Sequence, residues 1–256
     1  MSKYHIFGAL LTLAAWSGSY VSPTADVAGS WQVGSEAQAG VRWTPNPERG
    51  SASSTLSGGR RSASASACAL NASEPDPAIT LLVPSGDSGL TTAAQPTLSW
   101  YLESKNTADM EFVLSHPQQA EPVYTQKLRS GTGLVEVALP KEAALEEGTR
   151  YRWTVFVTCN GGENKIHARS FVERVPDASV MAAEAAPGPI AQADAYAVNG
   201  IWYDALNTLI KAYRSEATMS TLLEIRDLLA QAETDVPLEL SLATETQARV
   251  DASIND

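Results

Sequence analysis

The sequence is poor in cysteine, histidine and positive charge, and it has no long hydrophobic run. Two cysteines and three histidines among 256 residues are too few for a metal domain of the cysteine-rich or histidine-rich kind. Lysine and arginine number 18 against 29 aspartates and glutamates, a net charge of −11, which argues against nucleic acid as a partner. Since no apolar stretch reaches the length of a membrane span, stable membrane insertion is not expected.

The N-terminus has the order of a secretory signal. Lys3 and His5 precede an apolar run from Ile6 to Trp16, and small and polar residues follow it. This run has the length of the apolar region of a signal and falls short of the roughly 20 residues that a span needs. The pattern predicts a signal peptide over residues 1–19, and therefore export to the periplasm or the outside of the cell.

Export would carry Cys68 and Cys159 into an oxidising compartment. An isolated pair of cysteines there is more often a disulfide than a metal site. We therefore expect a disulfide between them, and no metal. Closing the roughly 90 residues between the two positions would stabilise the folded chain by about 4 to 5 kcal/mol, by loop-closure entropy alone.

Composition divides the rest of the chain. Residues 20–78 are rich in serine, alanine, glycine and proline. Such a segment buries too little apolar surface to offset the entropy that it would lose on ordering, so it is predicted to be a flexible arm. From Ile79 onward the apolar residues recur with a period of two, which is typical of strands.

Seven short runs rich in β-branched and aromatic residues follow the arm. They are residues 79–84, 96–102, 110–115, 122–128, 134–140, 150–159 and 170–175. Alternation is clear in the sixth run, where Tyr151, Trp153 and Val155 share one face. Seven strands in about 100 residues, with no helix between them, predict an antiparallel β-sandwich over residues 79–176. The strings PTLSW, residues 96–100, and LEEGTRYRWTV, residues 145–155, resemble the second and sixth strands of fibronectin-type-III-like modules. This resemblance implies a sandwich of fibronectin type III or immunoglobulin type.

The C-terminal part changes to a helical period. Residues 177–189 are rich in alanine, glycine and proline and are predicted to be a linker. Apolar residues then recur at helical spacing up to Gly200, again after it, and a third time over residues 222–229. The fold class is therefore expected to be α+β, with a small helical unit over residues 190–235 after the sandwich and a tail over residues 236–256.

The helical unit resembles a tetratricopeptide-type hairpin. In such a hairpin a glycine closes the first helix and small and apolar residues meet at the crossing. The matching positions are Gly200, Trp202, Ala205, Leu209 and Ala212. The proline that usually ends the second helix is Ala217 here, and one repeat is evident where arrays usually need about three. The unit is thus expected to pack against the sandwich or a partner.

The whole pattern resembles a family of exported, largely cyanobacterial proteins called domain of unknown function 928. The resemblance runs from the pair Gly58-Gly59 to about residue 235, and its most specific piece is NGIWYDAL, residues 199–206. The first motif departs from the family, which tends to have Gly-Gly-Thr-Arg-Gly where this chain has Gly-Gly-Arg-Arg-Ser. The resemblance implies the architecture and export, and it implies no activity.

One string suggests catalysis. Residues 86–89, Gly-Asp-Ser-Gly, resemble the nucleophile motif of trypsin-like serine proteases. Those enzymes place a histidine and an aspartate before the serine, and the only histidine before Ser88 is His5, within the predicted signal. His116 or His167 could still approach Ser88 in space. A turn between two strands is an adequate explanation of the string, so no catalytic residue is assigned.

Other polar groups are isolated in the sequence. Glu142, Glu146 and Glu147 lie before a turn, where acidic residues usually mark a solvated loop. His116 and His167 have no second ligand at the spacing of a zinc site. We therefore expect neither a metal nor a cofactor.

The aromatic residues around Gly200 leave two interpretations open. Tyr196, Trp202 and Tyr203 would cluster if neighbouring turns of two crossing helices fill one space. They could also form a patch that binds a protein partner. The candidate binding residues are Trp202, Tyr203 and Asp204. The sequence is best explained as an exported, non-enzymatic binding or scaffolding protein of the cell envelope. The alternatives are an envelope hydrolase that uses Ser88 or the acidic loop, and a purely structural envelope component.

Overall fold

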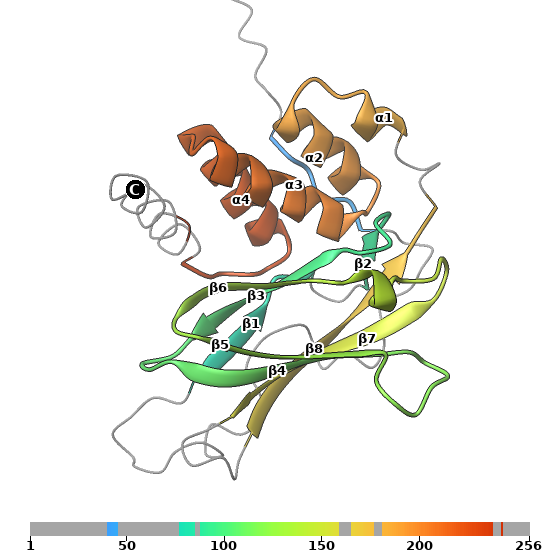
Figure 1. Cartoon of the computed structure of the whole chain (residues 1–256). Helices are drawn as coiled ribbons and strands as arrows, with labels where there is room; N and C mark the ends of the chain where they lie inside the picture. Colours follow the sequence, from blue (N-terminus) through green and yellow to red (C-terminus); the bar gives the residue numbers. More distant parts are fainter. Residues whose placement is uncertain are drawn as a thin grey trace, which may run out of the picture. The chain divides into compact units, whose positions relative to one another are not determined.

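The computed structural model describes residues 40–45, 77–84, 88–158, 165–176, 181–237 and 242. They all belong to one unit, Ala39–Asp256. In these ranges the chain forms two sheets, and the α-helices come after the last strand (Figure 1). The α+β class expected from the sequence is confirmed. The predicted signal peptide and both cysteines, Cys68 and Cys159, lie outside the described residues.

The two sheets have three and five strands. The smaller sheet has the order β1-β3-β6, with β1 Ala78–Leu81, β3 Thr97–Glu103 and β6 Gly133–Ala138. The larger sheet has the order β2-β8-β7-β4-β5, with β2 Gly89–Thr91, β8 Lys165–Arg174, β7 Arg150–Thr158, β4 Ala108–Ser115 and β5 Tyr124–Ser130. Neighbouring strands are antiparallel except for β2 and β8, which are parallel.

Each of the seven runs expected to be strands overlaps one, and the structure adds β2. This strand has three residues, too few to show a period. It is a strand because its backbone pairs with β8. Strand β8 also begins at Lys165, five positions before the run that the sequence indicates. Its first half alternates exposed polar residues with Ile166 and Ala168, both buried, and alanine contributes little to a hydrophobic pattern.

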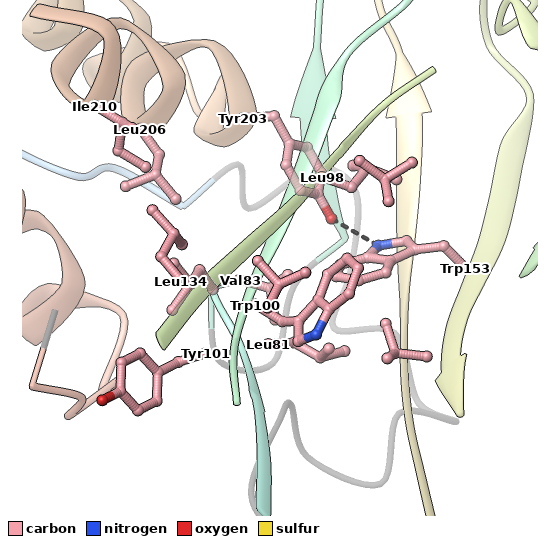
Figure 2. Close-up of a cluster of buried hydrophobic side chains, with 14 of the residues drawn as sticks. Leu81, Val83, Leu98, Trp100, Tyr101, Leu134, Trp153, Tyr203, Leu206 and Ile210 are labelled. Carbon is pink, nitrogen blue, oxygen red and sulfur yellow. Dashed lines mark hydrogen bonds between the residues drawn. The ribbon is translucent and has the colours of Figure 1, made fainter. Parts of the chain in front are cut away.

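Large aromatic side chains join the inner faces of the two sheets. Trp100 of β3 stacks on Phe112 of β4, with ring centroids 6.3 Å apart, and its ring centroid is 6.4 Å from that of Trp153 on β7. Figure 2 shows Trp100 and Trp153 among the aliphatic residues of this core. Because one cluster contains residues of both sheets, the two layers are stabilised as a single body.

Four helices follow β8. They are α1 Met181–Glu184, α2 Pro189–Val198, α3 Trp202–Ser215 and α4 Met219–Gln231. The three longer helices correspond to the three helical runs of the sequence. The short α1 lies in the segment predicted to be a linker, and the 3-10 helix η2, Lys141–Ala143, lies in the loop that contains the acidic residues.

Gly200 ends α2 in the left-handed conformation. Its φ is +74°, in the region that glycine enters without strain. The N–H of Gly200 donates to Ala197 O at 3.0 Å, and the N–H of Ile201 donates to Tyr196 O at 3.0 Å. These two bonds are those of a Schellman motif, which caps the last carbonyls of a helix. The glycine expected at the junction of the helices is thus explained by its backbone.

Residues 40–45 differ from the flexible arm expected for residues 20–78. We name Gly40–Pro45 the strap. Its Val41 is only 2% exposed, and the strap lies beside the helices (blue in Figure 1). Composition averaged over the arm hides this, because Val41 and Trp43 pack against helices that are distant in the sequence.

Candidate functional site

Trp202, the first residue of α3, joins the helices to the smaller sheet. Its side chain is fully buried. The indole N–H donates to Leu82 O, just after β1, at 2.8 Å. The ring also meets Trp43 of the strap edge-on, with centroids 5.0 Å apart, an arrangement that aromatic pairs favour. One side chain therefore contacts the sheet and the strap together.

Tyr203 joins α3 to the larger sheet. Its hydroxyl accepts the indole N–H of Trp153 at 3.0 Å, the dashed line in Figure 2, and donates to Phe171 O at 3.0 Å. Burial raises the pKa of Tyr203 well above its usual value, although hydrogen bonds from Trp153 and Ser170 act in the opposite direction. The ring lies so close to β2 that a Cβ at Gly89 would be 2.4 Å from its Cε2. Only glycine fits there without displacing the ring.

Asp204 and Asn207 continue these contacts along α3. One carboxylate oxygen of Asp204 accepts the N–H of Thr92 at 2.8 Å, and the other accepts the hydroxyl of Thr91 at 3.3 Å. The amide of Asn207 donates to Thr97 O, at the start of β3, at 2.9 Å. The polar side chains of this face of α3 thus bond to the strands of both sheets.

The three residues predicted to bind a partner are therefore brought together, and they face the sheets. Trp202 and Tyr203 have almost no exposed surface, and Asp204 is half-buried. This burial corresponds to the interpretation of NGIWYDAL as a core motif. A binding role for these three side chains stays a prediction.

Residues of α2 and α4 form hydrogen bonds with the main chain of the strap. The N–H of Val41 donates to Glu224 Oε2 on α4 at 2.7 Å. The N–H of Arg42 donates to Asp194 Oδ1 on α2 at 3.0 Å. Both acceptors are carboxylates, and hydrogen bonds to charged groups are stronger than those between neutral groups.

Gln231, at the end of α4, bonds the strap on both sides of Arg42. Its Oε1 accepts the N–H of Trp43 at 2.7 Å, and its Nε2 donates to Val41 O at 2.8 Å. The amide thus supplies one donor and one acceptor, as a neighbouring strand would. The N–H of Thr44 donates to Ala197 O on α2 at 3.1 Å. Four consecutive N–H groups of the strap are therefore bound.

Side chains of the strap alternate between the helices and solvent. Val41 is buried and Trp43 is half-buried on Trp202, while Arg42 and Thr44 are exposed. The helices consequently contact two of these four side chains and the main chain of all four. We name the contacting residues the strap site: Asp194, Ala197, Trp202, Glu224 and Gln231.

A comparison with protein families identifies the family of this chain. The model of the family described as Domain of Unknown Function (DUF928) matches residues 56–245. The chain belongs to this family. No curated protein matches it. The DUF928 match contains both sheets, the helices and every residue of the strap site, and it begins after the strap.

The hydrolase alternative draws no support from the described residues of this DUF928 chain. Ser88 directly precedes β2, and its Oγ is buried with no hydrogen-bond partner among them. His116 lies 4.0 Å from the carboxylate of Glu146. His167 lies on β8 with its ring near Phe156, at 5.7 Å. Neither histidine bonds to the Ser88 hydroxyl, which a serine nucleophile would need for activation.

The acidic loop is divided among separate contacts. Glu147 pairs with Arg174 at 3.2 Å, and the exposed Glu142 lies in η2. In the part of the chain that the structure describes, no three histidine, cysteine, aspartate or glutamate residues are placed to hold a metal ion. Among the described helices, none is long and apolar enough to cross a membrane.

The sequence analysis missed the strap site for a simple reason. Asp194, Glu224 and Gln231 are ordinary polar residues on amphipathic helices, where a solvated face is expected. Their role depends on the main chain of residues 41–43, which lies more than 150 positions away in the sequence from each of the three. The one local signal is the pattern Gly-Val-Arg-Trp-Thr, an alternation of apolar and polar residues inside a segment otherwise poor in large side chains.

Proposed function

We propose that this DUF928 protein is an exported, non-enzymatic binding or scaffolding protein of the cell envelope, and that it binds an extended polypeptide segment at the strap site. One observation carries the proposal: the helices hold the strap through four consecutive N–H groups, one carbonyl and two side chains. Elements that bind an extended chain through its backbone are a recurring means of peptide recognition.

The construction of the site also favours binding. Trp202 contacts the strap and is fixed by its bond to Leu82 O, while Tyr203 and Asp204 hold α3 to the larger sheet. A site whose side chains are locked by a supporting layer loses less entropy when a ligand binds. On this proposal, NGIWYDAL supports the binding surface without forming all of it.

The finer features of the fold belong to the same proposal. We infer that the sheets form a sandwich of fibronectin type III kind, since orders β1-β3-β6 and β2-β8-β7-β4-β5 enclose one core. Helices α2 and α3 would form a tetratricopeptide-like hairpin, supported by Gly200 at the junction and by the complete burial of Ala205. The N-terminal signal pattern supports export.

Rebinding of the strap sequence tests the function. The substitutions Val41→Ser and Trp43→Ala, made together in the full chain, would weaken the binding of the strap to the strap site; we call this doubly substituted chain the strap variant. The strap variant is titrated into a fluorescein-labelled peptide of residues 38–46, and the fluorescence anisotropy of the peptide is measured. We expect saturable binding, which Gln231→Ala should weaken. Arg226→Ala is the matched control, because Arg226 is exposed on α4 and pairs with Asp227.

Circular dichroism shows whether the strap variant remains folded. A folded strap variant that gives no saturable signal up to about 1 mM, the range of effective concentrations for a tethered segment, would refute the function. Equal binding with and without Gln231→Ala would show that the peptide binds elsewhere.

A further inference from the structure

We propose that the strap is an internal competitor, and that the strap site accepts in its place a segment of a second protein with the pattern small residue, β-branched residue, any residue, tryptophan. This inference rests on the proposed function. It adds the chemistry of the partner and the condition under which the partner binds.

The main-chain bonds define what any occupant must have. The N–H groups of residues 41 to 44 are all donated to the site, so proline is excluded at four consecutive positions of an occupant. In the strap, a proline follows immediately at Pro45, where the series of N–H bonds has ended. The occupant must also be extended, because Gln231 bonds Val41 O and the N–H of Trp43 together.

Two side chains of the occupant give the selectivity. Val41 is buried, and Trp43 meets Trp202 edge-on. A Cβ at Gly40 would lie 3.0 Å from Glu224 Oε2, so a small residue is favoured before the β-branched one. Arg42 points its side chain to solvent, and the site does not select at that position.

The position of the strap in the chain permits exchange. The DUF928 match begins at residue 56, so it includes the site and leaves out the strap. Residues 46–77 connect the strap to β1. A connection of this length can span about 100 Å when extended, so leaving the site does not require the rest of the fold to open.

Competition by the strap sets the condition for binding. A segment tethered by a few tens of residues competes at an effective concentration of about 1 mM. If the strap peptide binds with a micromolar Kd, an intact strap would weaken the binding of the same free peptide by about a thousandfold. A partner would therefore have to be locally concentrated, or match the site better than the strap does.

The test compares labelled peptides of residues 38–46 on the strap variant. Three changes should each weaken binding about tenfold or more: Val41→Ala, Trp43→Ala, and N-methylation of Trp43, which removes the N–H donated to Gln231. Arg42→Ala is the matched control peptide and should bind within about twofold of the parent peptide, because its side chain is not contacted.

The parent chain provides the second half of the test. It should bind the unmodified peptide at least about tenfold more weakly than the strap variant does, since its own strap competes. A dimer of the parent chain that forms with rising concentration and is lost in Trp43→Ala would support the inference, with a second copy of this chain as the source of the segment.

Three results would overturn the inference. If the strap variant binds all the peptides equally, a peptide-binding function survives and the proposed pattern is wrong. If the parent chain binds as tightly as the strap variant, the strap is not a competitor. If the strap variant binds peptide and the parent chain never does, even at peptide concentrations well above about 1 mM, the strap is a permanent part of the fold.

Discussion

Replacement of Trp202 by alanine should lower the free energy of unfolding by about 4 to 6 kcal/mol. Truncating a fully buried tryptophan costs about 3 to 5 kcal/mol through lost burial and the cavity that remains. Leu82 O would also lose the indole N–H that it now accepts at 2.8 Å, and an unpaired buried carbonyl costs about 1 to 3 kcal/mol. Partial relaxation around the cavity keeps the total below the sum of the upper values.

Equilibrium unfolding in urea, followed by far-ultraviolet circular dichroism, measures this loss without depending on the fluorescence of the removed indole. Trp202→Phe is the matched variant, because it keeps most of the ring and removes the N–H, and its loss should be smaller. Trp43 of the strap would also lose its ring contact, so trypsin should cleave after Arg42 faster in Trp202→Ala than in the parent chain.

An unfolding free energy of Trp202→Ala within about 0.5 kcal/mol of that of the parent chain would be typical of an exposed site. That result would refute the argument that Trp202 joins the helices to the sheets. The aromatic residues around Gly200 would then become the first place to look for a partner-binding patch.

Four further predictions follow from the same structure. Gly89→Ala should destabilise the chain by about 1 to 3 kcal/mol in urea unfolding, because its Cβ would overlap the ring of Tyr203; an unchanged midpoint would contradict that close contact. Burial raises the pKa of Tyr203, so the folded chain keeps a proton that the unfolded chain releases above about pH 10. The contribution of the protonated Tyr203 to stability is complete below that pH and is lost as pH rises. Above about pH 10 the free energy of unfolding should therefore fall more steeply in the parent chain than in Tyr203→Phe, by about 1.4 kcal/mol per pH unit. Equal slopes in the two chains would contradict this prediction. Cys68 and Cys159 should resist alkylation without reductant, as measured by intact mass, whereas two modified thiols in folded, exported protein would exclude the disulfide. Ser88 should not react with a fluorophosphonate probe, and labelling that disappears in Ser88→Ala would support the hydrolase alternative.

Local patterns in the sequence were sufficient for most of the elements. Runs of β-branched and aromatic residues mark the seven predicted strands, with clear alternation in the run that becomes β7, and a helical period marks α2, α3 and α4. These signals come from the geometry of a single element. Gly200 could be predicted for the same reason. The left-handed residue that ends α2 is required by hydrogen bonds to carbonyls only a few positions earlier in the chain. Strand β2 and the early start of β8 were missed. The three residues of β2 are too few to show a period, and β2 is a strand because it pairs with β8, which is distant in the sequence.

The candidate site could be predicted only in part, and for the same reason. The sequence singled out Trp202, Tyr203 and Asp204 as a cluster but left open whether they form core or surface. The structure places them against strands, with hydrogen bonds that cross 120 positions from Trp202 to Leu82 O and 112 positions from Asp204 to the N–H of Thr92. No local period carries information about such partners.

By itself, the sequence determined the α+β class, the order of seven strands and three helices, and the glycine that ends α2. Only the tertiary structure decided that the strap, in a segment of low complexity, is held by Glu224 and Gln231, which are 183 and 188 positions away from the strap residues that they bond. The physical reason is that periodicity and turn chemistry act over a few residues. A hydrogen bond to the main chain of a distant segment requires only that donor and acceptor meet in space, and it leaves no pattern in the sequence around either of them.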